Sequence, residues 1–448
     1  MAINMEDFFN YINSLGIIEP PDAFEVIEKM KVDDVMAVLD ECFLKVNGSK
    51  LSLPPDSLFN FSVNNSIAGD TYPCASITCR LERANTLSNF AALYSDAVVI
   101  PHFFDFAFES IGHHKPPQNE QQLNYLKTRL IGGIVIYLQY RPLIEAGIVQ
   151  VNPTLHLYCQ DCLQRKIAED EKLMGELDTA VQNIEGELID KVRFILDSPN
   201  SLVLADPEGY FGDIAFHFAI LPKELRKFVS KIPHVFSGRE VKKLGLFELV
   251  IEPAINDMTM QKFSAVAPET SYLTDRKFDS QIIEQFHPAE SHPGVIPKSM
   301  EHALPFIENV SLGKLIKIRQ DEPMAFDAYR SSVRKVMEIA INDPVHDHIK
   351  GAMRDLVEPE VSKIAHIIDA NKKFFQDKAK SKVLFNGMVM TAGYVGQHVF
   401  NVDPSVFKAI EIYSSKKIYD DLASSKTIPT EARSNPYYFL WRIKREAS

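Results

Sequence analysis

A short segment, "HLYCQDCLQR" at residues 156–165, holds the residues of this chain best suited to chemistry. It places His156, Cys159 and Cys162 at intervals of three residues. A Cys-x2-Cys turn brings two thiolates within reach of one tetrahedral ion, and thiolate and imidazole ligands suit zinc. The spacing therefore predicts a zinc site. Two unliganded thiols in a turn, or a redox-active pair, are the alternatives.

A structural zinc ion normally has four protein ligands, so this segment needs help from elsewhere in the chain. Cys74 and Cys79 are the candidates, with His156 as a possible third ligand of the first group. Cys42 falls in the apolar stripe of an expected helix and is predicted to lie in the core. Two cysteine pairs would close an all-thiolate site. Such a site would support folding and leave activity to other residues.

Carboxylates near short apolar runs form a second group of candidates. Asp96 and Asp105 flank the run "AVVIP" at 97–101, and Asp206 ends the run "SLVLAD". Acidic side chains at strand ends can bind Mg²⁺ for phosphodiester hydrolysis. Acids beside strands are also common in any α/β domain, and the Pro and Gly that follow Asp206 indicate a turn. These acids are candidates for a metal-dependent hydrolytic site, with ordinary loop roles as the alternative.

The apolar pattern around these residues predicts an α/β or α+β region over residues 1–285. Short runs at 97–101, 148–152 and 201–206 are typical of buried strands. Helical stripes alternate with these runs along the chain. Residues 163–197 carry apolar residues at steps of three and four, which predicts one long helix with a heptad-like face.

The second part of the chain has a different pattern. Residues 286–305 are rich in proline and histidine and predict a linker, and 306–448 are expected to be mainly helical. Within the latter, 383–402 contain no Asp, Glu, Lys or Arg over a length that suits a bilayer. Its asparagine, glutamine and histidine residues are costly in hydrocarbon. We therefore favour a buried helix or helical hairpin there, with a membrane span as the alternative.

Composition and charge narrow the class of protein. The chain has 448 residues, 46% of them hydrophobic, and a formal net charge of −12. These values are typical of a globular protein, and the surplus of acids disfavours extensive nucleic-acid binding because it repels phosphates. Five cysteines do not indicate a disulfide framework, and the N-terminus lacks the features of a secretory signal. We therefore expect a cytoplasmic location.

No motif of a common enzyme class occurs in the sequence: it has no Walker A loop, no G-x-G-x-x-G, no G-x-S-x-G and no H-E-x-x-H. We therefore predict an intracellular binding or regulatory protein with a structural zinc ion, whose helix over 163–197 contacts a protein partner or a second copy. Two alternatives stay open. One is a metal-dependent nuclease or phosphoesterase, and the other is a membrane-acting effector of a microbial defence or toxin system that uses 383–402.

Overall fold

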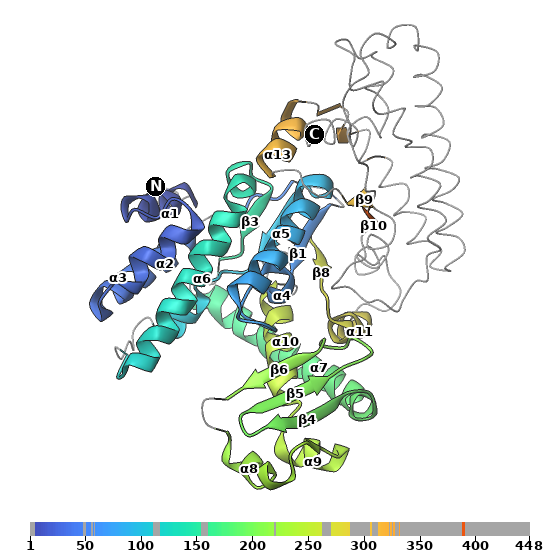
Figure 1. The fold of residues 1–448 in the computed structure, drawn as a ribbon. Helices are drawn as coiled ribbons and strands as arrows, with labels where there is room; N and C mark the ends of the chain where they lie inside the picture. Colours follow the sequence, from blue (N-terminus) through green and yellow to red (C-terminus); the bar gives the residue numbers. More distant parts are fainter. Residues whose placement is uncertain are drawn as a thin grey trace, which may run out of the picture. The chain divides into compact units, whose positions relative to one another are not determined.

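The structure, a computed structural model, describes most of the first 286 residues and short stretches beyond them (Figure 1). The described residues are 5–47, 51–54, 57, 59–110, 117–153, 160–218, 221–261, 270–286, 305–306, 312–321, 323–324, 326–327, 331 and 388–389. The chain forms two compact units, one of residues 1–85, 97–145 and 149–290 and the other of residues 86–96, 146–148 and 291–448. A parallel and an antiparallel sheet lie among helices in the first unit, so the expected mixed α/β class is confirmed over residues 1–283.

Three helices begin the described chain: α1 (Met5–Ser14), α2 (Pro20–Glu28) and α3 (Val32–Asn47). Their apolar residues recur every three or four positions and are buried, as Phe8 and Ile12 are in α1. A capping box of Glu19 and Asp22 begins α2. Cys42 is fully buried in α3, which confirms its assignment to the core.

The first sheet is parallel and has four strands: β1 (Asn60–Val63), β2 (Ala97–Ile100), β3 (Val149–Val151) and β8 (Ser271–Leu273). Their order is β3-β2-β1-β8. Four helical segments separate the first three strands along the chain: α4 (Asn65–Ala68), α5 (Ile77–Tyr94), the 3-10 helix η1 (Asp105–Ser110) and α6 (Glu120–Glu145). The strands expected at 97–101 and 148–152 are confirmed.

Sequence patterns did not reveal β1 or β8. β1 is only four residues long, and its sequence NFSV alternates polar with apolar residues inside a segment rich in proline, asparagine and serine. All four of its residues are nevertheless buried, because β2 and β8 pair with its two edges. β8 has three residues and lies beyond the last clear apolar run. Tertiary pairing therefore makes strands of segments whose local sequence is typical of loops.

The second sheet is antiparallel, with the order β6-β5-β4-β7. Its strands are β4 (Arg193–Ser198), β5 (Ser201–Ala205), β6 (Ile214–His217) and β7 (His234–Val235). The helices along this part of the chain are α7 (Gln160–Lys191), α8 (Lys223–Arg226), the 3-10 helix η2 (Val229–Lys231), α9 (Gly238–Leu244), α10 (Glu248–Gln261) and α11 (Lys277–Phe286). The strand expected at 201–206 is confirmed.

The long helix differs from the expectation at its C-terminal end. α7 ends at Lys191, and 193–198 form β4 rather than the last turns of the helix expected over 163–197. Val192 and Ile195 continue the helical spacing, but the buried pair in β4 is Phe194 and Leu196, which has the period of a strand. Pairing with β5 and β7 decides between the two periods.

The heptad-like face of α7 packs within its own unit. Leu177, Ile184 and Leu188 are buried in one apolar cluster with Phe194 and Leu204 of the antiparallel sheet. The apolar spacing of this helix is therefore accounted for by intramolecular packing along its C-terminal half.

The described part of the second unit includes one helix and a two-stranded ladder beyond residue 300. These are α13 (Leu312–Asp321) and the antiparallel strands β9 (Pro305–Phe306) and β10 (Met388–Val389). Most of the expected linker at 286–305, of the helical region at 306–448 and of the segment at 383–402 lies outside the described residues. Within the described ranges, no helix combines the length and apolar character needed to cross a bilayer.

Two adjacent glycines in α6 allow close packing in the first unit. A methyl group at Gly132 would overlap the guanidinium of Arg80, and one at Gly133 would overlap the ring of Phe104. Both neighbours are buried. Glycine is otherwise unfavourable inside a helix. Gly132 and Gly133 suit these positions because larger residues would displace Arg80 and Phe104.

This packing predicts opposite effects for the same substitution in two helices. Gly132→Ala should lower the free energy of unfolding by about 1–3 kcal/mol, because Arg80 must move. Gly186→Ala in α7 has open space around the new methyl group and should raise stability by about 0.5–1 kcal/mol. Urea unfolding followed by circular dichroism measures both, and a stabilising Gly132→Ala would contradict the packing argument.

Candidate functional site

The direction in which the parallel sheet is wound changes between β1 and β8. From β1 the chain passes to β2 and then to β3 on one side, and β8 adds on the other side. Val63 and Leu273 are paired in register, so the residues that follow the two strands are neighbours at the carboxyl edge of the sheet. In open α/β sheets, ligands bind at this edge where the winding direction changes. The polar residues found there are therefore the leading candidate site.

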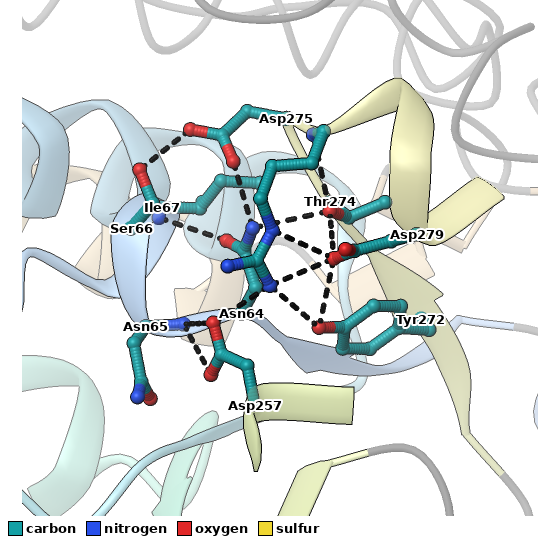
Figure 2. A network of polar contacts seen from close by, with 10 residues as sticks. Asn64, Asn65, Ser66, Ile67, Asp257, Tyr272, Thr274, Asp275 and Asp279 are labelled. Atoms are coloured by element: carbon teal, nitrogen blue, oxygen red, sulfur yellow. Dashed lines mark hydrogen bonds and ion pairs between the residues drawn. The ribbon is translucent and has the colours of Figure 1, made fainter. Parts of the chain in front are cut away.

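Asn64 connects the ends of the two strands. Its Nδ2 donates to Thr274 Oγ1 at 3.1 Å and to Asp275 Oδ1 at 2.7 Å (Figure 2). Its Oδ1 accepts from the Ile67 N–H at 2.9 Å, which makes Asn64 the N-cap of α4. The Ser66 hydroxyl donates to Asp275 Oδ2 at 2.6 Å. Asp275 is thus held by both the cap and the first turn of α4.

Arg276 occupies the centre of the site. Its Nη2 donates to Asp257 Oδ2 at 2.7 Å and to Asp279 Oδ2 at 2.8 Å, and its Nε donates to Asp279 Oδ2 at 2.9 Å. The side chains of Arg276, Asp257 and Asp279 are only 1%, 2% and 0% exposed. These contacts form a buried ion-pair network with two carboxylates on one guanidinium.

The two carboxylates also bind groups from other elements. Asp257, in α10, accepts from the Asn65 N–H at 2.9 and 3.1 Å. Asp279, in α11, accepts from Thr274 Oγ1 at 2.6 Å and from Tyr272 OH at 3.3 Å. We call this set of residues the switch-point cluster: Asn64, Asn65, Ser66, Asp257, Tyr272, Thr274, Asp275, Arg276 and Asp279 (Figure 2).

Electrostatics in the cluster are dominated by burial. Removal from water raises the pKa of Asp257 to about 7 and also raises that of Asp279. Burial alone would lower the pKa of Arg276, but the adjacent carboxylates hold it well above its usual value. Three carboxylates, including Asp275, surround one guanidinium, so the cluster carries a surplus of negative charge when all are ionised.

Several buried polar atoms in and beside the cluster lack a hydrogen-bond partner among the described residues. They are Asn65 Oδ1, Tyr72 OH, Arg276 Nη1 and Asp279 Oδ1. Asn65, Tyr72 and Asp275 are only partly buried, whereas Arg276 is fully buried. Unpaired buried polar atoms are rare in folded proteins and often mark a site that binds water, an ion or a ligand. We call the partly exposed residues Asn65, Tyr72 and Asp275 the rim, and they adjoin the buried charged side chains of Asp257, Arg276 and Asp279.

Two arginines of α5 hold the loop that carries the rim. Arg80 Nε donates to Gly69 O at 2.8 Å. Arg83 donates from Nε to Ser66 O at 2.8 Å and from Nη2 to Asp70 O at 2.6 Å. Burial lowers the pKa of Arg80 to about 10. Gly69, at φ +86°, ends α4 in the left-handed region and lets the chain turn toward these arginines.

The carboxylates expected near β2 are not brought together as a pair. Asp96 directly precedes β2, and Arg319 Nη2 lies 4.0 Å from its Oδ1. Arg319 Nη1 also donates to the carbonyls of Ala91 and Ala92, at the C-terminal end of α5. Asp105 begins η1, beyond the other end of β2. In the part of the chain that the structure describes, no group of three His, Cys, Asp or Glu residues could hold a metal ion.

Asp206 organises a turn, as the alternative interpretation expected. Its Oδ2 accepts from the N–H groups of Phe211 and Gly212. Its own N–H donates to Asp213 Oδ1 at 2.8 Å. Gly209, at φ +73°, completes the turn. Its Oδ2 and its backbone N–H are thus engaged within the turn.

The residues of the expected zinc site lie only partly within the described ranges. His156 and Cys159 are outside them, and Cys162 falls in the first turn of α7 with its side chain not described. Cys74 and Cys79 are partly buried and form no disulfide. The zinc site therefore stays a prediction.

His102 is the histidine at the carboxyl edge of the sheet, just after β2. Its Nδ1 accepts from the Phe104 N–H at 3.1 Å and its Nε2 lies 3.3 Å from the Phe43 carbonyl, to which it donates as the neutral tautomer. Complete burial lowers its pKa to about 4. His102 is therefore a neutral structural residue rather than a proton carrier near pH 7.

Sequence reasoning missed the switch-point cluster. Its members come from distant parts of the chain, and Asn64, Asp257 and Arg276 follow no known motif. The available signals were local: an asparagine before "NSIAG", and a "TDRKFD" run that extends from the end of β8 into the first turn of α11. The sequence matches no protein-family model, and comparisons with curated proteins and with solved structures also give no match.

The neutral state of His102 predicts a pH effect on stability. An unfolded histidine binds a proton below about pH 6.5, whereas the folded His102 does so only near pH 4, so wild-type stability falls as pH drops through this window. The loss should reach roughly 3 kcal/mol relative to His102→Asn. Urea unfolding at pH 4.5 to 7.5 measures it. The exposed His217→Asn is the matched control, and a constant difference between wild type and His102→Asn would contradict the assignment.

The zinc prediction is tested by elemental analysis of the purified protein. We expect one zinc ion per chain, lost in Cys159→Ser/Cys162→Ser together with much of the folding stability, because a closed thiolate site contributes to folding. Cys42→Ser is the control, since that thiol is buried in α3 away from any expected ligand role. A freshly reduced preparation without zinc would refute the site.

Proposed function

We propose that this chain is a binding or regulatory protein that takes a small polar molecule at the rim of the switch-point cluster. The observation that supports this most directly is the change in winding direction between β1 and β8, with polar residues at both carboxyl ends. Strand ends at such a point diverge to helices on different sides, which leaves room for a ligand between them. The polar atoms around Asn65 and Asp275 would supply its recognition.

The chemistry of the rim selects among ligands. Asp275 offers a partly exposed carboxylate, the buried Asn65 Oδ1 lacks a partner among the described residues, and the buried carboxylates add negative charge. Asp257 already accepts the N–H at the start of α4, where an anion would otherwise bind. A ligand that donates hydrogen bonds through hydroxyl or amino groups therefore suits the rim, and free phosphate does not.

The contacts of the other acids favour binding over metal-dependent hydrolysis. Asp96 lies beside Arg319, and Asp206 accepts the N–H groups of its own turn. Neither contact pattern is that of a carboxylate directed toward a shared cation. We therefore prefer a binding role to a nuclease or phosphoesterase.

Calorimetric titration of the full-length protein tests the proposal with three probes: adenosine, glucosamine and inorganic phosphate. Adenosine or glucosamine should bind and raise the thermal unfolding midpoint, because their hydroxyl or amino groups can donate to the rim. Asp275→Asn should weaken that affinity by about ten- to a hundredfold, since a charged hydrogen bond is worth about 1.5–3 kcal/mol.

Asp213→Asn is the matched control, because Asp213 lies in the turn between β5 and β6 of the antiparallel sheet. This variant should bind adenosine or glucosamine with the affinity of the wild type. Binding of phosphate alone, or equal affinity in Asp275→Asn and wild type, would contradict a donor-bearing ligand at this rim.

A further inference from the structure

The central ion-pair network has one more buried carboxylate than buried cation. Asp257 Oδ2 and Asp279 Oδ2 both bind the same nitrogen, Nη2 of Arg276, at 2.7 and 2.8 Å. All three side chains are at most 2% exposed. Desolvating a second carboxylate without a second counter-ion is costly, so the network needs another positive charge or a neutral carboxyl group.

The surrounding groups do not supply that charge. Within the described chain, the charged and titratable groups that face the pair are Asp275 and Arg276 after β8, Tyr272 in β8 and Tyr72 from the loop after α4. Asp275 adds negative charge, and burial keeps both phenols protonated by raising their pKa. The contribution of α4 is a hydrogen bond from the uncharged Asn65 N–H to Asp257 Oδ1. Arg276 is therefore the one cation among these groups.

One carboxylate oxygen of the pair is free to carry a proton without losing a contact. All hydrogen bonds of Asp279 in the described structure go to Oδ2, from Thr274, Tyr272 and Arg276. Its Oδ1 is buried and has no partner among the described residues. Protonation of a carboxylate at such an oxygen forms one O–H bond, consumes one solvent proton and removes the surplus charge.

We propose that Asp257 and Asp279 together hold one proton in the folded protein at neutral pH, and that this proton stabilises the junction of β8, α10 and α11. The two carboxyl groups titrate as a coupled pair, so the proton belongs to the pair rather than to one residue. Raising the pH removes it and leaves two ionised carboxylates on one guanidinium. The junction beside the proposed ligand rim is thereby made sensitive to pH, and this inference stands whether or not a ligand binds there.

The sign of the effect follows from linkage. The folded pair keeps its proton to higher pH than the unfolded chain does, so the folded state binds more protons between about pH 5 and 7. The equilibrium constant for opening should rise up to tenfold per pH unit in this window because of the pair. His102 acts in the opposite direction, so total stability must be compared between variants that all retain it.

Hydrogen exchange measured by mass spectrometry tests the proposal locally, on peptides that cover 270–286. Asp279→Asn replaces the unpaired Oδ1 with an uncharged amide and imitates the protonated state. After correction for intrinsic exchange rates, the wild type should lose protection relative to Asp279→Asn by up to tenfold per pH unit, and the variant should be the better protected protein at pH 8.

Thr274→Val is the matched control, because it removes a hydrogen bond to Asp279 without changing the charge. Because that hydrogen bond favours the ionised form of Asp279, the variant should keep the pH dependence of protection and move it to higher pH. Asp257→Asn and the infrared absorption of the wild type provide second measurements if Asp279→Asn does not fold. A protonated carboxyl band at pH 6.5 that vanishes by pH 8.5 supports the proposal. A wild type more protected than both asparagine variants by a constant factor from pH 5 to 8, or no such band, overturns it.

Discussion

The guanidinium of Arg276 connects several elements of the first unit. It binds Asp257 of α10 and Asp279 of α11, and these carboxylates in turn bind α4 and the end of β8. The parallel strands are only three or four residues long, so their ladders provide few hydrogen bonds. Buried ion pairs are costly to form and costly to break by removing one partner, about 3–5 kcal/mol. Such a cluster therefore specifies one arrangement of the strand ends.

A second set of buried cations supports the loop after β1. Arg80 and Arg83 of α5 donate to backbone carbonyls between Ser66 and Cys74, and the absence of a side chain at Gly132 makes space for Arg80. The loop after β1 is thus held in part by hydrogen bonds to charged donors. These hydrogen bonds fix the positions of the polar groups of the loop, which the proposed binding role requires.

The proposed function and the proposed proton share one physical cause, which is the surplus of carboxylates around Arg276. An exposed carboxylate that lacks a cation attracts hydrogen-bond donors from a ligand. A buried carboxylate that lacks a cation binds a proton instead. Asp275 is partly exposed and belongs to the first case. Asp257 and Asp279 are fully buried and belong to the second. Exposure, rather than residue type, separates their roles.

Local sequence determined the elements whose pattern is repeated over many residues. The helical stripes of α1 and α3, the buried Cys42, the strands β2, β3 and β5, and the turn at Asp206 all follow from spacing, β-branching or turn residues, because each rests on contacts close along the chain. Tertiary structure alone decided where α7 ends, since Val192 and Ile195 suit both a helix and a strand until β5 pairs with β4. It also made a strand of NFSV and brought Asn64 beside Asp275, 211 residues away along the chain. Such contacts join residues far apart in sequence, and their free energy comes from burial and pairing that no short window of residues contains.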